Sequence, residues 1–171
     1  MKKLLAIAGL IGIVGLAAAP AFADQADGKD TTTFDVKANV EASCKFTAAS
    51  AIDFGNLNVY NFGTQEKTGS LTILCTAGPS YRVELDNGSN VDGSQRRMKK
   101  SGSANYLAYG LFSDAAHLVA WGAGATDDVD FTGDGDSKIL TVYGQMDWSE
   151  ALLPEAPTGS YLDTITATVL F

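Results

Sequence analysis

The segment from Gly159 to Phe171 constrains the fold of this chain more than any other stretch, because its side chains follow a period of two. Four apolar side chains alternate with Thr164, Thr166, Thr168 and Leu170; they are Ile165, Ala167, Val169 and Phe171. This period, combined with many β-branched residues, is typical of a half-buried β-strand. The last residues of most domains fray, yet here the apolar face runs to Phe171. We therefore expect this strand to be tied into a sheet or to be required by a partner.

The N-terminus has the pattern of a secretory signal peptide. A positive start, Met1-Lys2-Lys3, precedes an uncharged apolar run over residues 4–19, and Ala21-Phe22-Ala23 forms a small-x-small cleavage site. We predict a signal peptide over residues 1–23, with cleavage between Ala23 and Asp24. A membrane anchor is the alternative, but the run is shorter than the roughly 20 apolar residues that a spanning helix needs. The mature chain is therefore expected to be exported and to have no membrane span.

The mature chain has the size and charge of one acidic domain. The part of the 171 residues that follows the signal peptide suits a single domain, for which about 100 to 200 residues are usual. The formal net charge of −8 disfavours a nucleic-acid partner, because phosphates repel an acidic surface. The basic run Arg96–Lys100 is interpreted as a solvated strand or loop rather than as an anion-binding surface.

The two cysteines, Cys44 and Cys75, are predicted to form a disulfide, because an exported chain matures under oxidising conditions. Such a bond would close a loop of about thirty residues, which chain-entropy arguments value at about 3 to 4 kcal/mol. The alternatives are a thiol nucleophile and a metal site. Neither cysteine has a second Cys or a His at ligand spacing, and the single histidine is His117.

Short alternating segments bounded by turn residues occupy most of the mature chain. No segment sustains helical periodicity over three turns, and Ser113–His117 suits at most a single helical turn. The expected strands cover residues 52–60, 71–75, 81–85, 105–112, 118–121, 138–148 and 159–171. Many short strands and 18 glycines predict an all-β antiparallel sandwich or barrel.

A further strand is expected near the N-terminus of the mature chain. Residues 24–30 have no apolar pattern and are expected to form a tail. From Thr31 onward, four apolar side chains alternate with Asp35, Lys37, Asn39 and Glu41; they are Phe34, Val36, Ala38 and Val40. This spacing places the four apolar side chains on one face of an extended strand.

The sequence offers little for catalysis, and we predict that the protein is not an enzyme. It has one histidine, no Gly-x-Ser-x-Gly elbow and no phosphate-binding glycine loop. A pair of carboxylates could serve a glycosidase, but the sequence offers no means of pairing them.

The acidic stretch Asp127–Asp136 invites a calcium interpretation. Counted from Asp128, it places Asp130, Thr132 and Gly133 as an EF-hand loop would. The twelfth position is Ile139 rather than glutamate, and no helices flank the stretch. A solvated loop is therefore the preferred interpretation, and a weak calcium site is the alternative.

A set of short motifs occurs in order along nearly the whole mature chain. They are Cys44, Phe54-Gly55, Leu71–Cys75, Tyr81–Gly88, Arg97-Met98, Leu107–Asp114, Trp121-Gly122, Thr141–Gly144 and Gly159–Thr164. Together they resemble the spore coat protein U domain family, which includes the Csu-type major pilins of archaic chaperone–usher pili. The order of the motifs and the closing Gly-x-Tyr-x-Asp-Thr pattern make the set specific.

The resemblance implies an incomplete immunoglobulin-like β-sandwich that lacks its final strand and exposes an apolar groove beside its C-terminal strand. It implies that a periplasmic chaperone fills this groove first. An outer-membrane usher then exchanges the chaperone strand for the N-terminal segment of the next subunit. The chain would be a pilin that forms a homo-polymer with identical or related subunits at the cell surface, supporting adhesion and biofilm formation. No cofactor or metal is implied.

Within this scheme, residues 24–43 form the N-terminal tail and donor strand, and residues 44–171 form the sandwich domain. The donor side chains are Phe34, Val36, Ala38 and Val40. The side chains expected to line the acceptor groove and bind the chaperone are Ile165, Ala167, Val169 and Phe171. Room for one domain favours a rod or minor subunit over a two-domain tip adhesin. The alternative function is a secreted, self-contained spore-coat or ligand-binding module.

Overall fold

The structure is a computed structural model that describes residues 28–124 and 127–171. The predicted signal peptide and its cleavage site lie outside the described residues. The chain divides into two units, Met1–Ala38 and Asn39–Phe171. The described part of the first unit, residues 28–38, is exposed and contains no strand or helix.

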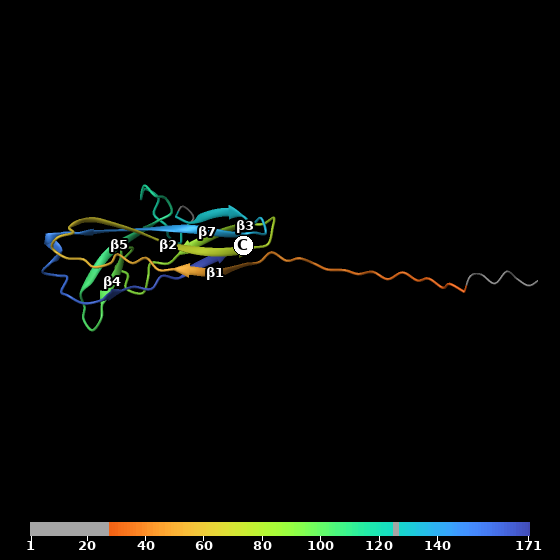
Figure 1. Cartoon of the computed structure of the whole chain (residues 1–171), viewed down its shortest axis with the longest axis horizontal. Coiled ribbons are helices and arrows are strands. Elements are labelled where there is room, and N and C mark those ends of the chain that lie inside the picture. The colour runs from red at the N-terminus through yellow and green to blue at the C-terminus, as the bar shows by residue number, and fades with distance from the viewer. Residues whose placement is uncertain (1–27, 125–126) are drawn as a thin grey trace, which may run out of the picture. The chain divides into compact units, whose positions relative to one another are not determined.

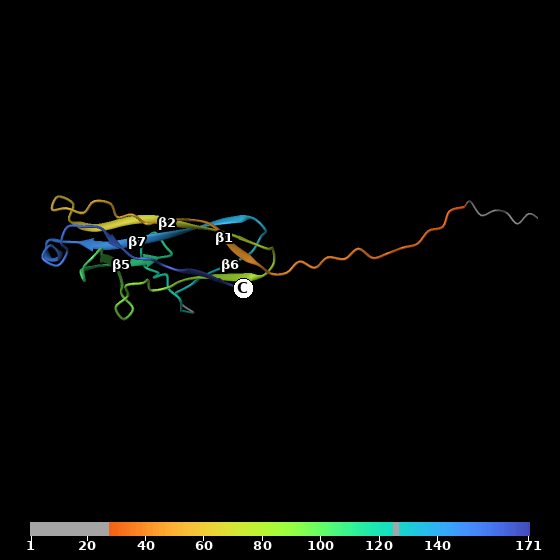
Figure 2. The same ribbon diagram turned by 90° about the horizontal axis from the view of Figure 1, so that it is seen from below.

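The second unit contains two antiparallel β-sheets (Figures 1 and 2). The larger sheet has the strand order β1-β2-β7-β5-β4-β8, and the smaller has the order β6-β3-β9. The strands are β1 (Cys44–Ser50), β2 (Gly63–Cys75), β3 (Ser80–Leu85), β4 (Arg96–Lys100), β5 (Tyr106–Phe112), β6 (Val129–Thr132), β7 (Ser137–Trp148), β8 (Tyr161–Leu162) and β9 (Ala167–Leu170). One 3-10 helix, η1 (Glu150–Leu152), accompanies them. The predicted all-β architecture is confirmed.

The longest pairing, between β2 and β7, runs from Gly63 opposite Trp148 to Leu74 opposite Ser137. Along β7, the predicted alternation is confirmed, because Leu140, Val142, Gly144 and Met146 are buried, whereas Thr141, Tyr143 and Gln145 on the other face are not. The core fills the space between the sheets with the buried side chains Ile73, Cys75, Tyr81, Val83, Leu85, Leu107, Tyr109, Leu111, Trp121, Leu140, Val142, Met146 and Trp148. None of the helices among the described residues is long and apolar enough to cross a membrane.

A disulfide closes one end of the sandwich, called the disulfide end below. Cys44 and Cys75 are bonded and lie opposite each other in the β1–β2 register, with Cα atoms 4.1 Å apart. The next residue, Thr76, accepts a hydrogen bond from the hydroxyl of Tyr81 through its carbonyl oxygen. The Tyr81 ring packs edge-on against Phe171, with ring centroids 6.2 Å apart. The C-terminus of the chain therefore lies at the disulfide end, as Figure 1 also shows.

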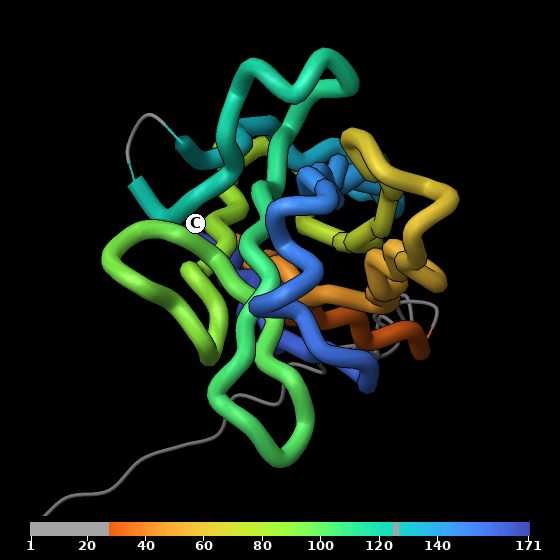
Figure 3. Tube along the Cα trace, turned by 90° about the vertical axis from the view of Figure 1, so that its left-hand side faces the viewer, coloured from red at the N-terminus to blue at the C-terminus, as the bar shows by residue number. Residues whose placement is uncertain are grey.

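The opposite end of the sandwich, the turn end, is formed by the chain between β1 and β2 and by the segment after β7. Gly63 and Trp148 pair there, at the start of β2 and the end of β7. The Trp148 indole N–H donates to the carbonyl oxygen of Asn58 at 2.9 Å. Figure 3 views the sandwich from this end, with the residue 56–62 turn in yellow and the chain after β7 in blue.

Four segments depart from the expected strands, and one of them, residues 163–166, is described with the groove below. Residues 52–60 follow β1 but carry no strand assignment, because Asp53 accepts the N–H of Gly55 at 2.8 Å and bends the backbone locally. The expected strand at residues 118–121 is reduced to a single bridge between Phe112 and Ala120. Residues 31–42, where a strand was expected, have no strand partner among the described residues.

Candidate functional site

An open apolar groove of about 960 Å³ lies between the C-terminal segment and the chain that follows β1. One wall is formed by residues 49–59, and the other by residues 156–165 together with Ala167. The floor comes from both sheets and consists of Leu71, Leu85, Met98, Leu107, Tyr109, Leu111, Val142 and Trp148. Because core side chains form this floor, the groove opens onto the interior of the sandwich.

Two glycines of the larger sheet leave room for the first wall of the groove to pack directly on that sheet. Gly69 and Gly144 lie on the neighbouring strands β2 and β7. A Cβ at Gly69 would lie 2.8 Å from Ile52 Cγ1, and a Cβ at Gly144 would lie 2.9 Å from Ile52 Cγ2 and 3.3 Å from Phe54 Cζ. Side chains at these two positions would lift Ile52 and Phe54 off the sheet. The glycines therefore allow residues 52–54 to form a wall without strand pairing.

The second wall is the C-terminal segment, which passes from one sheet to the other. β8 pairs with β4 in the larger sheet, and β9 pairs with β3 in the smaller sheet. The residues between β8 and β9 belong to no strand. The sequence predicted one strand over this whole stretch, and that prediction is wrong for residues 163–166. Here side-chain hydrogen bonds replace the regular ladder, together with two separate backbone bonds, from the Asp86 N–H to the Thr166 carbonyl and from the Ser89 N–H to the Thr164 carbonyl.

Asp163 makes the largest share of these bonds. Its Oδ1 accepts hydrogen bonds from the backbone N–H of Ser89 at 3.0 Å, from the backbone N–H of Asn90 at 3.2 Å and from the Asn90 amide at 2.9 Å. Its Oδ2 accepts the hydroxyl of Tyr109 at 2.7 Å. Asp163 thus ties the groove wall to a distant loop and to a side chain of the groove floor.

Asp86 and Arg96 complete this polar cluster. The Asp86 carboxylate accepts the backbone N–H of Thr166 at 2.9 Å. Arg96 is buried and donates to the carbonyl oxygen of Leu85 at 3.1 Å, and to that of Asp86 from Nε at 2.9 Å and from Nη2 at 2.6 Å. The buried guanidinium therefore satisfies the backbone where β3 ends.

The cluster shifts the pKa of each group according to its surroundings. Burial raises the pKa of the Tyr109 phenol, and the hydrogen bond to Asp163 and the charge of Asp163 raise it further. Burial lowers the pKa of the Arg96 guanidinium, whereas the carboxylate charges of Asp86 and Asp163 act in the opposite direction. Tyr109 therefore remains a neutral hydrogen-bond donor at the groove floor.

Burial alone would raise the pKa of Asp86, but hydrogen bonds from Thr166 and Gly88 and the charge of Arg96 outweigh it. The pKa consequently lies below its ordinary value of 3.8. Because the folded-state pKa is lowered, Asp86 stabilises the fold above its unfolded pKa. This contribution is lost as the pH falls through the lowered folded-state value.

Replacing Asp163 with alanine is expected to lower the free energy of unfolding by about 1 to 3 kcal/mol, because four hydrogen bonds, three of them partly buried, lose their acceptor. Urea unfolding monitored by tryptophan fluorescence measures the change, in a chain whose groove is filled by a second copy of residues 31–42 that a flexible linker joins after Phe171. Asp147→Ala is the matched control, since that exposed carboxylate accepts one side-chain hydrogen bond, from Thr64 at 3.0 Å. Equal midpoints for the two variants would show that Asp163 does not hold the groove wall.

The predicted groove residues fall into two pairs. Ile165 and Ala167 are half-buried and line the groove. Val169 packs against the core, and Phe171 is 63% exposed at the disulfide end, and neither belongs to the groove lining. In the strand order, β9 pairs only with β3, so its other edge is open among the described residues. The sequence did not identify the first wall, although the alternation of Ile52 and Phe54 was a signal for it.

The predicted donor side chains are all exposed. Val36 is 86% exposed, and Phe34, Ala38 and Val40 are exposed as well. On the opposite face, Lys37 and Asp35 form an ion pair at 2.8 Å. Residues 28–43 carry no strand, so this apolar face has no ladder partner in the described part of the chain.

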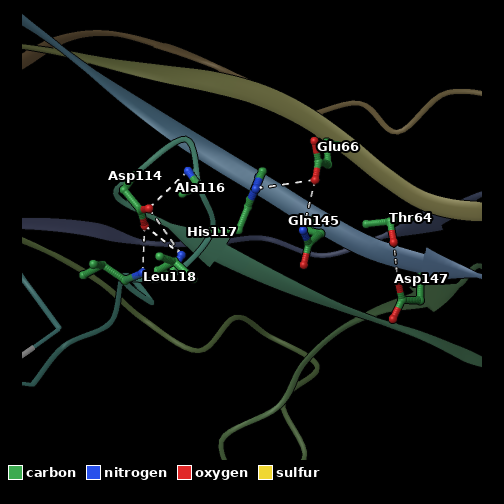
Figure 4. A network of polar contacts seen from close by, with 9 residues as sticks. Thr64, Glu66, Asp114, Ala116, His117, Leu118, Gln145 and Asp147 are labelled. Carbon is green, nitrogen blue, oxygen red and sulfur yellow. Dashed lines mark hydrogen bonds and ion pairs between the residues drawn. The ribbon is translucent and has the colours of Figure 1, made fainter.

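The single histidine lies on the outer face of the larger sheet, beside Glu66 of β2 (Figure 4), and it is not among the residues that line the groove. The His117 side chain is largely buried between the rings of Phe112 and Tyr143, and its Nδ1 lies 3.5 Å from Glu66 Oε1. Asp114 accepts backbone N–H groups from the same loop, including that of Val119 at 2.7 Å. These contacts fix a loop on the sheet, which is a structural role.

The acidic stretch that invited a calcium interpretation shows no ligand cluster. Among residues 28–124 and 127–171, no group of three or more His, Cys, Asp or Glu side chains is arranged to hold a metal ion. Asp134 instead accepts the backbone N–H of Asp136 at 2.9 Å within the turn before β7.

These features define a class of protein, an immunoglobulin-like β-sandwich with an apolar groove open beside its last strand. The Spore Coat Protein U domain family matches residues 30–168. The chain therefore belongs to this family. Protein U of Myxococcus xanthus is 29% identical over 178 residues, which cover 93% of this chain and 94% of Protein U.

Solved structures share the fold. One is the CsuC–CsuE chaperone–tip adhesion subunit pre-assembly complex from archaic chaperone–usher Csu pili of Acinetobacter baumannii, with a TM-score of 0.54 and 24% identity. That match covers 77% of this chain and 40% of the matched chain, so this chain spans less than half of its length. The P pilus rod subunit PapA has a TM-score of 0.52 and 14% identity over 74% of this chain and 97% of PapA. At these identities the likeness establishes the fold alone.

Proposed function

We propose that the protein is a structural pilus subunit that polymerises by donor-strand exchange, with a periplasmic chaperone and an outer-membrane usher as assembly partners. The observation that carries this proposal is the apolar groove beside the open edge of the C-terminal segment. Chaperone–pilin complementation is a known form of strand addition to a sheet edge. The fold shared with a chaperone-bound subunit and a pilus rod subunit supports the same function.

The groove has the chemistry that an inserted strand needs. Its floor is apolar, and β9 offers unpaired backbone groups on the side away from β3. An open edge of this kind is a template for pairing with another chain. A strand with one apolar face would bury that face on the floor and pair its backbone with the wall that contains Ile165 and Ala167.

The N-terminal segment of another copy has these properties. Phe34, Val36, Ala38 and Val40 share one face and are exposed. The seven residues from Phe34 to Val40 span about 20 Å when extended. We therefore propose these four residues as the donor side chains and the C-terminal segment as the acceptor.

The geometry favours an occupant from a second copy. All strand pairings in both sheets are antiparallel. A donor strand antiparallel to the C-terminal segment would place Val40 at the turn end, near Asn58, whereas Cys44 of the same chain is fixed at the disulfide end. The connection from Val40 to Cys44 reaches at most about 14 Å, which is shorter than the donor segment itself. An antiparallel donor must therefore belong to another subunit.

In this function the protein is exported through the periplasm to the cell surface and acts without catalysis, cofactor or metal. The proposed product is a fibre in which each subunit completes the sandwich of its neighbour. Adhesion and biofilm formation would be properties of that fibre.

The test is to express the chain with its signal sequence in a bacterial host that exports it to the periplasm. Expression with a cognate chaperone and usher is compared with expression without them. With both partners present, unheated samples should show a ladder of polymers on a denaturing gel, and heating should collapse the ladder to monomer. Without the chaperone the subunit should be degraded or aggregate. A stable monomer made without a chaperone would instead support a self-contained module. In that module, the chain's own N-terminal segment would fill the groove and run parallel to the C-terminal segment.

A further inference from the structure

We propose that the turn Asn58–Phe62 is a second subunit contact, outside the groove, that abuts the disulfide end of the neighbouring copy in the fibre. This inference rests on the proposed function and adds to it a surface that sets the angle between successive subunits. The occupant is the neighbouring copy whose N-terminal segment fills the groove.

The turn presents apolar side chains from a fixed backbone. Tyr60 is 94% exposed, and Val59 and Phe62 are exposed beside it. Asn58 and Asn61 hold the turn, because the Asn58 N–H donates to Asn61 Oδ1 at 2.8 Å and the Tyr60 N–H donates to Asn58 Oδ1 at 2.9 Å. Exposed apolar side chains that cluster on an ordered turn are typical of an interaction surface.

This apolar surface is continuous with the groove. Val59 belongs to the groove lining, as does Trp148. The Phe62 ring packs against Trp148, with centroids 6.1 Å apart. A chain that leaves the groove at the turn end must therefore pass directly over Val59 and its neighbours.

The tether between donor strand and domain is short. Only Glu41, Ala42 and Ser43 separate Val40 from Cys44. When Val40 of the neighbouring copy leaves the groove at the turn end, that copy's Cys44 can lie at most about 14 Å away. The disulfide end of the neighbouring copy is therefore held against the turn end of the first.

The disulfide end offers a matching surface of two adjoining turns. The turn over residues 76–79 and the turn that begins at Gly133 are joined, because the Gly78 N–H donates to the Gly133 carbonyl at 3.0 Å and the Gly133 N–H donates to the Pro79 carbonyl at 3.1 Å. Ala77 is exposed and Pro79 half-buried on this surface. The small apolar groups of the first turn suit contact with the ring of Tyr60, and the exposed carboxylates of Asp134 and Asp136 on the second turn are acceptors for its hydroxyl.

Photo-crosslinking tests this contact. A benzoylphenylalanine placed at Tyr60 in the full chain, assembled with chaperone and usher, should give a covalent dimer that survives heating. Peptide mapping should locate the link in residues 76–79 or 133–136 of the neighbouring copy, whereas a link confined to residues 41–45 would report only the passing tether and would overturn the inference. The same probe at Leu118, which is 82% exposed on the outer-face loop, should give no dimer.

A second readout is the bending of fibres in electron micrographs. Tyr60→Ser should leave the amount of fibre unchanged but shorten its persistence length, whereas Leu118→Ser should change neither. The inference would be overturned if normal fibres showed no crosslink from position 60, or a crosslink to any other region. Unchanged stiffness of Tyr60→Ser fibres would also overturn it. Failure of the unmodified chain to form any polymer would overturn the proposed function, and this inference with it.

Discussion

Val36→Asp is expected to abolish polymerisation while leaving the complex with the chaperone intact. Val36 is the second of the four donor side chains, so the new carboxylate would be buried without a partner in the core of the neighbouring subunit. Loss of the valine burial and burial of an unpaired charge together weaken insertion by about 4 kcal/mol or more, which is about a thousandfold in affinity. The groove of the variant is unchanged, so chaperone capture should be normal. Polymer ladders on unheated gels and co-purification with the chaperone measure the two effects.

Asn39→Asp is the matched control for this substitution. It adds the same charge to the same segment, but on the face that alternates with Val36 and points away from the groove. Polymers should form with this variant. If Val36→Asp abolished the chaperone complex as well, the segment would belong to the fold of its own domain and would not be a donor strand.

Removing the disulfide with Cys44→Ala and Cys75→Ala is expected to lower the free energy of unfolding by about 3 to 4 kcal/mol. The bond closes the ladder where β1 begins, and β1 leads directly into the first wall of the groove. Without the bond, β1 can separate from β2 at the point where the donor segment leaves the domain. The groove wall at residues 49–59 would then lose its attachment.

The disulfide effect is best measured in a chain that carries a second copy of residues 31–42 after Phe171, joined by a flexible linker. Such a chain fills its own groove in the antiparallel direction, so its unfolding can be followed without a partner. Reduction of the unmodified cysteines is the control, because it breaks the bond without deleting the buried sulfur atoms. A loss below about 1 kcal/mol in both experiments, or free thiols in exported protein, would contradict the prediction.

Local patterns in the sequence determined the fold class and which side chains of several segments face inward. The alternation along β7 was correct because a strand between core and solvent must change environment at every residue. The same reasoning identified Ile165 and Ala167 as inward-facing residues of the last segment. The pairing of Cys44 with Cys75 followed from export and from the absence of any other cysteine.

Contacts between residues far apart in the sequence decided the rest. The break at residues 163–166 arises because the Asp163 carboxylate bonds to Ser89 and Asn90, and no local pattern reveals those partners. The first wall exists because Gly69 and Gly144, on two different strands, leave room for Ile52. An alternating pattern indicates which face of a strand is buried, but it does not indicate which residues pack against that face. The tertiary structure therefore determined that the last segment crosses between sheets and that a groove remains beside it.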